Sequence, residues 1–215
     1  MPALTPVSSR ILALVIGYVL GNFLTAAAVV RIARGQSVYE IGSGNPGMAN
    51  VGAQLGVPYA ALVLIGDIGK TALAAYLAWR LASPICGRIA ILYAGVGATL
   101  GHNFPVWVRF RGGKGVATTC SAIAFFTPIA GILCDIAGWI VVGVTHSLPL
   151  GAVVIPGAYL VYCLITQGAE ASILAGILTL LMYYRHWPGL VACFKGRREA
   201  KEPEDPAESQ TESQA

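Results

Sequence analysis

The chain has 215 residues, of which 56% are hydrophobic and only 11% are charged, and its mean hydropathy is +0.69. A water-soluble domain of this size could not bury that much apolar surface, so the composition excludes an ordinary soluble fold and favours a membrane protein. The formal net charge is +4, but the basic residues stand at the ends of apolar runs rather than in a solvated patch with aromatic residues, which excludes nucleic acid as the expected partner.

The apolar runs predict an all-α fold, a polytopic membrane helix bundle of about seven transmembrane helices, because about 20 apolar residues cross a bilayer. The first expected span, residues 11–30, stops at Arg31 and Arg34, which is typical of a cytoplasmic loop and places the N-terminus outside. A signal peptide cleaved after the Ala26-x-Ala28 pattern is the less favoured alternative.

Six further spans follow from the same pattern. They are residues 55–77, residues 89–100, three spans cut from residues 116–167, and residues 170–184. Arg80 and Arg88 would bracket an outside turn, and the basic residues after the last span place the C-terminus in the cytoplasm. These spans form a predicted membrane domain of residues 1–195. Residues 196–215 are rich in Pro, Glu, Ser and Gln and predict a disordered acidic tail.

A glycine-rich loop, residues 42–52, follows the first span. Its glycines let the backbone turn several N–H groups toward one point, which would bind an anion. Its hydroxyl and amide side chains can hydrogen-bond a phosphate or a polyol. The candidate binding residues are Gly42, Ser43, Gly44, Asn45, Gly47 and Asn50. A tight interfacial turn with no ligand is the alternative.

A second loop, residues 101–118, places glycines and a lysine just ahead of an apolar run. Amides at the start of that helix, together with the lysine, could hold phosphate oxygens. The candidate residues are Gly112, Gly113, Lys114 and Gly115. The spacing of a Walker A loop is absent, so ATP is not expected. His102 at the start of this loop could act as a general base or phosphate donor, or could anchor the loop by hydrogen bonds.

Two further pairs of polar residues stand within or beside spans. Asp67 and Lys70 are three residues apart and share a helix face, which predicts an intramembrane ion pair, either structural or functional. Arg185 and His186 end the last span. They either serve topology alone or complete a cationic cluster with Lys114 around a phosphorylated substrate.

Several motifs of known chemistry are absent. The sequence has no GxSxG elbow, and none of its three histidines is followed by an aspartate five positions later. Its five cysteines form no CxxC pair, so neither a metal site nor any other cofactor is expected.

In their order along the chain, these motifs resemble the PlsY family of bacterial membrane acyltransferases, which move a fatty acyl group from acyl phosphate to the 1-hydroxyl of glycerol 3-phosphate. The resemblance rests on GSGNPG at residues 42–47, GDxxK at residues 66–70, the whole of residues 101–118, and Arg185-His186. It implies a seven-helix enzyme of the bacterial inner membrane, with its active site facing the cytoplasm and lysophosphatidic acid for phospholipid synthesis as its product.

The resemblance also implies residue roles. Ser43, His102 and His186 would be catalytic, the second-loop glycines and Lys114 would bind phosphate, and Lys70 and Arg185 would assist binding. The expected partners are glycerol 3-phosphate, acyl phosphate and membrane lipid, and a monomer is expected. The resemblance is incomplete, since the family usually has threonine where this chain has Ala49, arginine at Ala53, glycine at Thr71, asparagine at Gly189 and glutamate near Arg198. These departures keep open an alternative, a non-catalytic or altered homologue that binds or transports a phosphorylated small molecule or lipid.

Overall fold

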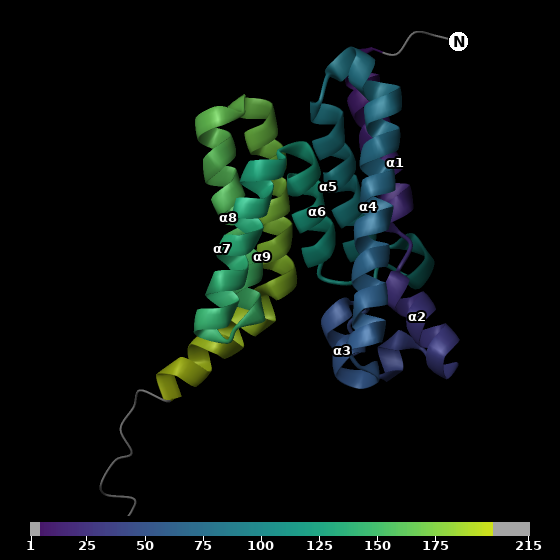
Figure 1. Cartoon of the computed structure of the whole chain (residues 1–215), viewed down its shortest axis with the longest axis vertical. Helices are drawn as coiled ribbons and strands as arrows, with labels where there is room; N and C mark the ends of the chain where they lie inside the picture. The colour runs from purple at the N-terminus through teal and green to yellow at the C-terminus, as the bar shows by residue number, and fades with distance from the viewer. Residues whose placement is uncertain (1–4, 200–215) are drawn as a thin grey trace, which may run out of the picture.

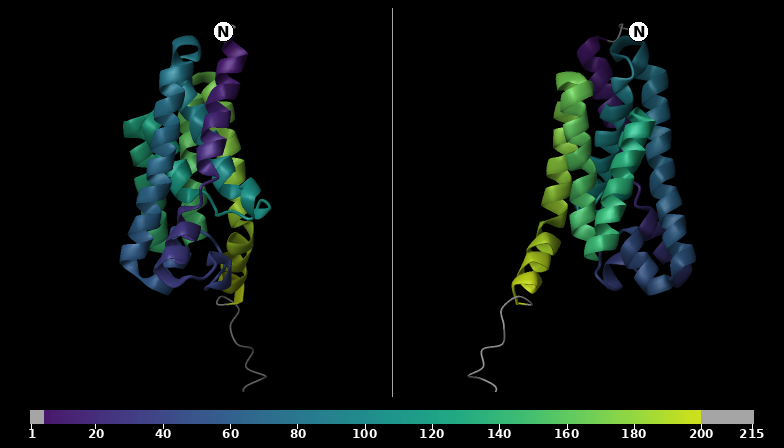
Figure 2. Two further views of the ribbon diagram at one scale, coloured as in Figure 1. Left: turned by 90° about the vertical axis from the view of Figure 1, so that its right-hand side faces the viewer. Right: turned by 60° about the vertical axis from the view of Figure 1, so that its left-hand side comes forward.

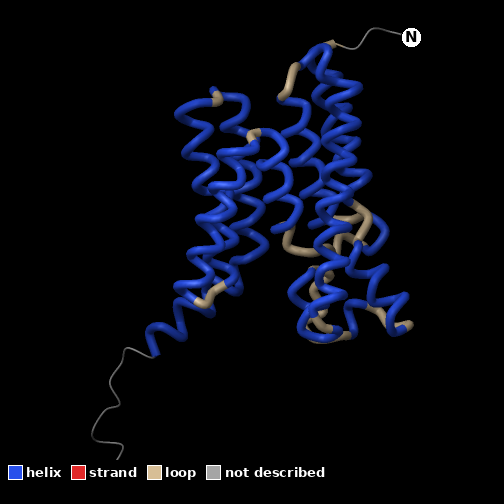
Figure 3. Tube along the Cα trace, viewed as in Figure 1, coloured by secondary structure: helices blue, strands red, loops and turns tan. Residues whose placement is uncertain are grey.

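The structure, a computed structural model, describes residues 5–199, and this part of the chain is helical with no strand (Figures 1 and 3). In chain order the elements are α1 (Pro6–Gly21), α2 (Thr25–Arg34), η1 (Val38–Glu40), α3 (Met48–Leu55), α4 (Val57–Cys86), α5 (Ile89–Asn103), η2 (Val106–Val108), α6 (Val116–Phe126), α7 (Pro128–Thr145), α8 (Leu148–Thr166) and α9 (Gly168–Glu199). The predicted all-α membrane bundle is therefore confirmed.

The helices form two groups joined by α6 (Figures 1 and 2). Helices α1, α4 and α5 pack together in one group, and α7, α8 and α9 pack in the other. Helix α6 contacts α4, α5, α7 and α8, while the short helices α2 and α3 lie beside the lower part of α4. The start of α1 and the end of α9 lie at opposite ends of the bundle. The loops that carry the glycine motifs are all in its lower half.

Five segments of the described chain are long and apolar enough to cross a bilayer. They are Pro6–Arg34, Val57–Cys86, Ile89–Val108, Pro128–Thr145 and Leu148–Thr166. Helix α6 is apolar but has only 11 residues, a length of about 16 Å, and so reaches about half-way through a bilayer. The count of seven crossings stays a prediction.

Three of the expected spans differ from the observed helices. The last, expected at residues 170–184, is the longer helix α9, which continues through Arg185 and Pro188 to Glu199. The first apolar run is broken at residues 22–24 into α1 and α2, directly after Gly21 and with Asn22 capping α1. The second continues to Cys86, so the expectation of a turn beginning at Arg80 is wrong and the chain turns at Gly87 instead. Arg80 is exposed on the helix, so its charge does not need a turn. The division of residues 116–167 into three helices is confirmed.

Glycines bring α1 and α5 into backbone contact. A Cβ atom at Gly17 would lie 2.0 Å from the carbonyl oxygen of Ala94, and one at Gly101 would lie 2.2 Å from that of Tyr18. Small residues four apart allow such close approach between membrane helices, where packing rather than the hydrophobic effect drives association. This contact fixes α5, which carries His102, against the end of α1.

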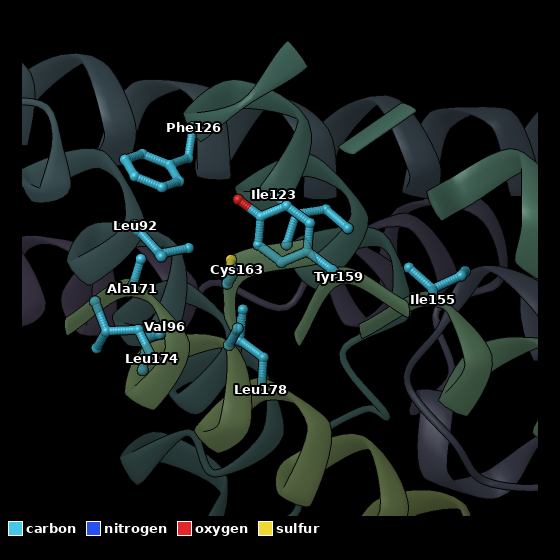
Figure 4. Close-up of a cluster of buried hydrophobic side chains, with 11 residues drawn as sticks. Leu92, Val96, Ile123, Phe126, Ile155, Tyr159, Cys163, Ala171, Leu174 and Leu178 are labelled. Atoms are coloured by element: carbon cyan, nitrogen blue, oxygen red, sulfur yellow. The ribbon is translucent and has the colours of Figure 1, made fainter. Parts of the chain in front are cut away.

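A second contact surface joins the two groups through a core of α5, α6, α8 and α9 residues (Figure 4). Ile123 of α6 and Leu178 of α9 are fully buried in it, together with Tyr159 of α8. The Tyr159 hydroxyl is 2.7 Å from the hydroxyl of Thr127, which satisfies both polar groups within the apolar core. This core packs α6 between the two groups of helices.

The predicted tail at residues 196–215 stays a prediction. Helix α9 continues to Glu199, and residues 200–215 lie outside the described part of the chain.

Candidate active site

A cavity of about 500 Å³ lies where the two glycine loops meet the bundle. We call its loop side the polar end, which is lined by Ser43, Asn45, Asp67, His102, Lys114 and His186. The rest runs between α4, α6, α7 and α8, and we call it the apolar limb. It is lined by Leu64, Ile68, Ala124, Phe125, Gly138, Trp139, Val142 and Ile155, among others. The cavity thus offers both a charged and a lipid-like environment.

Two helix N-termini open onto the polar end. Helix α3 begins after Gly47 and α6 begins after Gly115, and the first residues of both helices line the cavity. The first N–H groups of a helix have no partner within it, and the helix dipole adds partial positive charge there. Two such ends facing one cavity make a site suited to an anion.

The first glycine loop is held by hydrogen bonds of its own. The Asn50 side chain accepts from the Ser43 N–H at 2.9 Å and donates to the Ile41 carbonyl at 3.1 Å. The Gly44 N–H donates to the same carbonyl at 2.9 Å. These amides therefore shape the loop rather than converge on an open anion site. The Ser43 side chain, in contrast, is exposed and lines the cavity.

The second glycine loop pairs with the end of α5. The Gly112 N–H donates to the Asn103 carbonyl at 3.2 Å, and the Gly113 N–H donates to the His102 carbonyl at 3.0 Å. A Cβ atom at Gly113 would lie 2.2 Å from His102 Nε2. These two glycines therefore bring the loop against the histidine, and their amides are already paired.

Lys114 projects from this loop into the cavity. It is half-buried, and no ion pair or hydrogen bond of its ammonium is present among the described residues. Burial, and secondarily the positive charge of Arg185, lower its pKa below the usual value for lysine. A half-buried cation without a counter-ion would be stabilised by a bound anion.

Asp67 and Lys70 form the expected ion pair, with Lys70 Nζ 2.8 Å from Asp67 Oδ1. The same ammonium donates to the Phe23 carbonyl at 2.7 Å, where α1 ends and α2 begins. It also lies 2.9 Å from His102 Nδ1. Because a lysine ammonium can only donate, His102 accepts at Nδ1 and carries its proton on Nε2. All three side chains are buried.

His186 has the opposite arrangement. It is buried, and its Nδ1 lies 3.1 Å from the Met182 carbonyl. Since a carbonyl only accepts, Nδ1 carries the proton and Nε2 keeps a free lone pair. His186 lines the cavity, so this lone pair is available to a substrate proton. The two histidines therefore differ, with His102 a donor at Nε2 and His186 an acceptor.

The structure brings most of the predicted site residues together. Those that line the cavity are Ser43, Asn45, Gly47, Asn50, Asp67, His102, Lys114, Gly115 and His186. Those that do not line it are Gly42, Gly44, Lys70, Gly112, Gly113 and Arg185. Arg185 instead donates to the Gly112 carbonyl at 2.6 Å and stacks on the Phe104 ring, so it braces the second loop.

Three features of the site were not identified as site features from sequence. Met48 and Ala49 line the cavity at the start of α3. Asn103 is fully buried beside Gly115, and neither polar atom of its side chain has a partner among residues 5–199. Asp135 of α7 lines the cavity far from either loop in sequence. For Asp135 the available signal was a lone acidic residue within a long uncharged stretch.

This fold and cavity define an integral membrane protein that can place an anionic head group and an apolar chain side by side, as a lipid-modifying enzyme does. The family model described as glycerol-3-phosphate acyltransferase matches residues 11–196, and the chain belongs to that family.

Similar proteins cover nearly the whole chain. Glycerol-3-phosphate acyltransferase 1 of Lactobacillus acidophilus is 37% identical over 188 residues, which are 87% of this chain and 90% of that protein. Glycerol-3-phosphate acyltransferase of Paramagnetospirillum magneticum is 34% identical over 201 residues, which are 92% of this chain and 94% of that protein. The crystal structure of PlsY, an integral membrane glycerol 3-phosphate acyltransferase, in its glycerol 3-phosphate form has a TM-score of 0.77 at 23% identity. It covers 94% of this chain and 98% of its own.

One departure from the family pattern has a visible structural counterpart. A Cβ atom at Gly189 would lie 2.7 Å from Pro149 Cγ, and Pro149 lines the cavity. The asparagine expected at this position would therefore not fit without a shift of the α8 N-terminus. Ala53, where an arginine was expected, is exposed on α3 and does not line the cavity.

Proposed function

We propose that this protein is a membrane acyltransferase that moves a fatty acyl group from acyl phosphate to the 1-hydroxyl of glycerol 3-phosphate, giving lysophosphatidic acid for phospholipid synthesis. The observation that carries the proposal is the single cavity that joins a polar end to an apolar limb. Family membership supports the acceptor and the reaction. The substrates would meet at the junction of the two parts, with no need for the acyl chain to leave the membrane.

Phosphate groups would bind at the polar end. Lys114 supplies a positive charge there, and the N-termini of α3 and α6 supply unpaired N–H groups. Ser43 and Asn45 lie on the same wall and can hydrogen-bond the glycerol hydroxyls. Charge-assisted contacts of this kind orient a phosphorylated substrate as well as hold it.

Acyl transfer would proceed by direct attack. His186 Nε2 takes the proton of the 1-hydroxyl as its oxygen bonds to the acyl carbonyl carbon. The bond between that carbon and the bridging phosphate oxygen breaks, and phosphate leaves with the electron pair. Lys114 and the α6 N-terminus would neutralise the charge on the leaving phosphate. His102, with its proton on Nε2, would donate a hydrogen bond to the substrates.

We extend the proposal to the orientation of the molecule. The positive-inside pattern supports seven crossings of the bacterial inner membrane, with the N-terminus outside and the polar end facing the cytoplasm. The start of α1 and the end of α9 lie at opposite ends of the bundle (Figure 1), which agrees with an odd number of crossings. Reporter fusions after residue 34 and after residue 87 would test this, since the first should report the cytoplasm and the second the outside.

Purified protein in detergent should convert labelled glycerol 3-phosphate to lysophosphatidic acid when given acyl phosphate, and should fail with acyl-CoA. Product with acyl-CoA alone would refute acyl phosphate as the donor but would support glycerol 3-phosphate as the acceptor. Tight binding of glycerol 3-phosphate without product from either donor would support the non-catalytic alternative. The same preparation should behave as a monomer in light scattering, as expected from a cavity built by one chain.

A further inference from the structure

Asp135 of α7 is the only charged residue between residues 116 and 167. It lines the apolar part of the cavity, and its Oδ1 atom is buried without a hydrogen-bond partner among the described residues. The thiol of Cys120 on α6 faces the carboxyl group, and a thiol is only a weak donor. The carboxyl group therefore lacks a strong donor inside a substrate cavity.

The hydroxyl of Ser121, the residue after Cys120, does not donate to Asp135. Ser121 also lines the cavity, but its hydroxyl donates to the Ala117 carbonyl at 2.7 Å. Ala124, Phe125 and Ile155 along the limb are apolar, and Trp139, which also lines it four residues after Asp135, makes no hydrogen bond to the carboxyl group in the described structure. With no protein donor bonded to it in the described chain, Asp135 Oδ1 is open to a hydrogen bond from a molecule that fills the limb.

The position of the carboxyl group along the limb follows from α6. Cys120, which faces Asp135, is five residues beyond Gly115 at the polar end, which is about 7.5 Å along the helix axis. Ala124, further along the limb, is nine residues beyond Gly115, or about 13.5 Å. An acyl chain lying in the limb therefore passes Asp135 about half-way between the levels of Gly115 and Ala124.

We propose that Asp135 selects the acyl donor by accepting a hydrogen bond from a hydroxyl group carried midway along the acyl chain. This inference rests on the proposed function, since it assigns the apolar limb to the acyl chain. A plain chain leaves the buried carboxyl oxygen without a donor, whereas a hydroxylated chain satisfies it. The difference corresponds to a preference of about tenfold in kcat/KM for the hydroxylated donor.

The test compares palmitoyl phosphate with palmitoyl phosphate that carries one hydroxyl, in a series that moves the hydroxyl from the carbonyl toward the chain end. Wild-type protein should prefer the mid-chain member about tenfold. Asp135→Leu should abolish that preference, mainly by using the plain donor faster. Asp135→Asn keeps a polar group of the same shape and should retain part of it. Ile136→Leu, on the exposed face of α7, should keep the wild-type ratio.

The ratio of two donors on one preparation does not depend on how much of a variant is folded. As a second measurement, the mid-chain hydroxylated lysophosphatidic acid should raise the melting temperature of wild-type protein more than the plain product does, and Asp135→Leu should remove the difference. Equal ratios in wild type and Asp135→Leu would overturn this inference alone. Absence of product from every donor in wild type would refute the proposed function, and this inference with it.

Discussion

Lys70 Nζ lies 2.9 Å from His102 Nδ1 and at the same time contacts Asp67 and the Phe23 carbonyl. One ammonium thus joins α4, the end of α5 and the break between α1 and α2. Because it donates to Nδ1, it also decides which nitrogen of His102 carries the proton. The ion pair expected from sequence is therefore a support for the catalytic histidine as well as for the fold.

Lys70→Met should destabilise the protein strongly, because Asp67 would remain buried without its cation. A loss of about 3–5 kcal/mol in the free energy of unfolding is expected. Thermal melting in detergent would measure it. Asp67→Asn combined with Lys70→Met should recover part of the loss. If the double variant is as unstable as the sum of the two single variants, the pair is not coupled and this account fails.

Lys114→Ala should lower kcat/KM for glycerol 3-phosphate, since the phosphate loses a charge-assisted partner. The expected loss is about 1.5–3 kcal/mol, or roughly 10- to 150-fold. The melting temperature should not fall, because the lysine has no partner in the described chain. Arg109→Asn removes a charge from the same loop at an exposed position with positive φ and should leave kcat/KM unchanged.

The rate should also depend on pH through Lys114. Burial lowers the pKa of this lysine, so its positive charge is present at neutral pH and is lost, as the pH rises, sooner than for an ordinary lysine. We expect kcat/KM to fall on the alkaline side at a pH below 10.5. Lys114→Arg should move this fall to higher pH, because arginine keeps its charge. A pH profile identical in both proteins would show that another group titrates.

His186→Gln should reduce kcat by about 10²- to 10⁴-fold, because the general base is lost. Binding of glycerol 3-phosphate, measured by calorimetry, should change little, since Lys114 and the helix N-termini remain. His146→Asn provides the control, because His146 is exposed and outside the cavity. A large loss of binding with an unchanged kcat would instead assign His186 to the phosphate.

Gly17→Ala should destabilise the protein by about 1–3 kcal/mol, because the added methyl group would meet the Ala94 carbonyl. Gly143→Ala on α7 is the matched control, since no atom of the described residues lies within 4 Å of its added Cβ. That change should be neutral or slightly stabilising in a helix. Melting temperatures of the two variants in one detergent would decide the matter, and equal values would refute the close contact of α1 with α5.

Much of the fold was predictable because the membrane imposes simple rules. The apolar runs located the helices, and Thr127-Pro128 correctly divided α6 from α7. The break at residues 22–24 was not predicted, although Gly21 and Asn22 are residues typical of helix ends. Lys70 of α4 donates to the Phe23 carbonyl there, a contact that no local pattern reveals. The turn predicted at Arg80 was wrong, because an exposed arginine can extend from a helix without ending it.

The side chains of the site could be predicted from sequence, but the hydrogen bonding of its backbone amides could not. Ser43, Lys114 and His186 were each identified from short motifs, and all three line one cavity. The glycine loops were expected to offer free amides, but Asn50 and the end of α5 already pair several of them. The place of Asp135 depends on the register of α7 against α6, which no local pattern reveals.

The backbone contact between α1 and α5 has a consequence for how the family could diversify. Almost any side chain added at Gly17 or Gly101 would push the two helices apart and move His102. Helix α7, by contrast, contributes Asp135, Trp139 and Val142 to the cavity from outside that rigid pair. Selection can therefore alter the α7 wall and the range of acyl donors while the phosphate end stays constant.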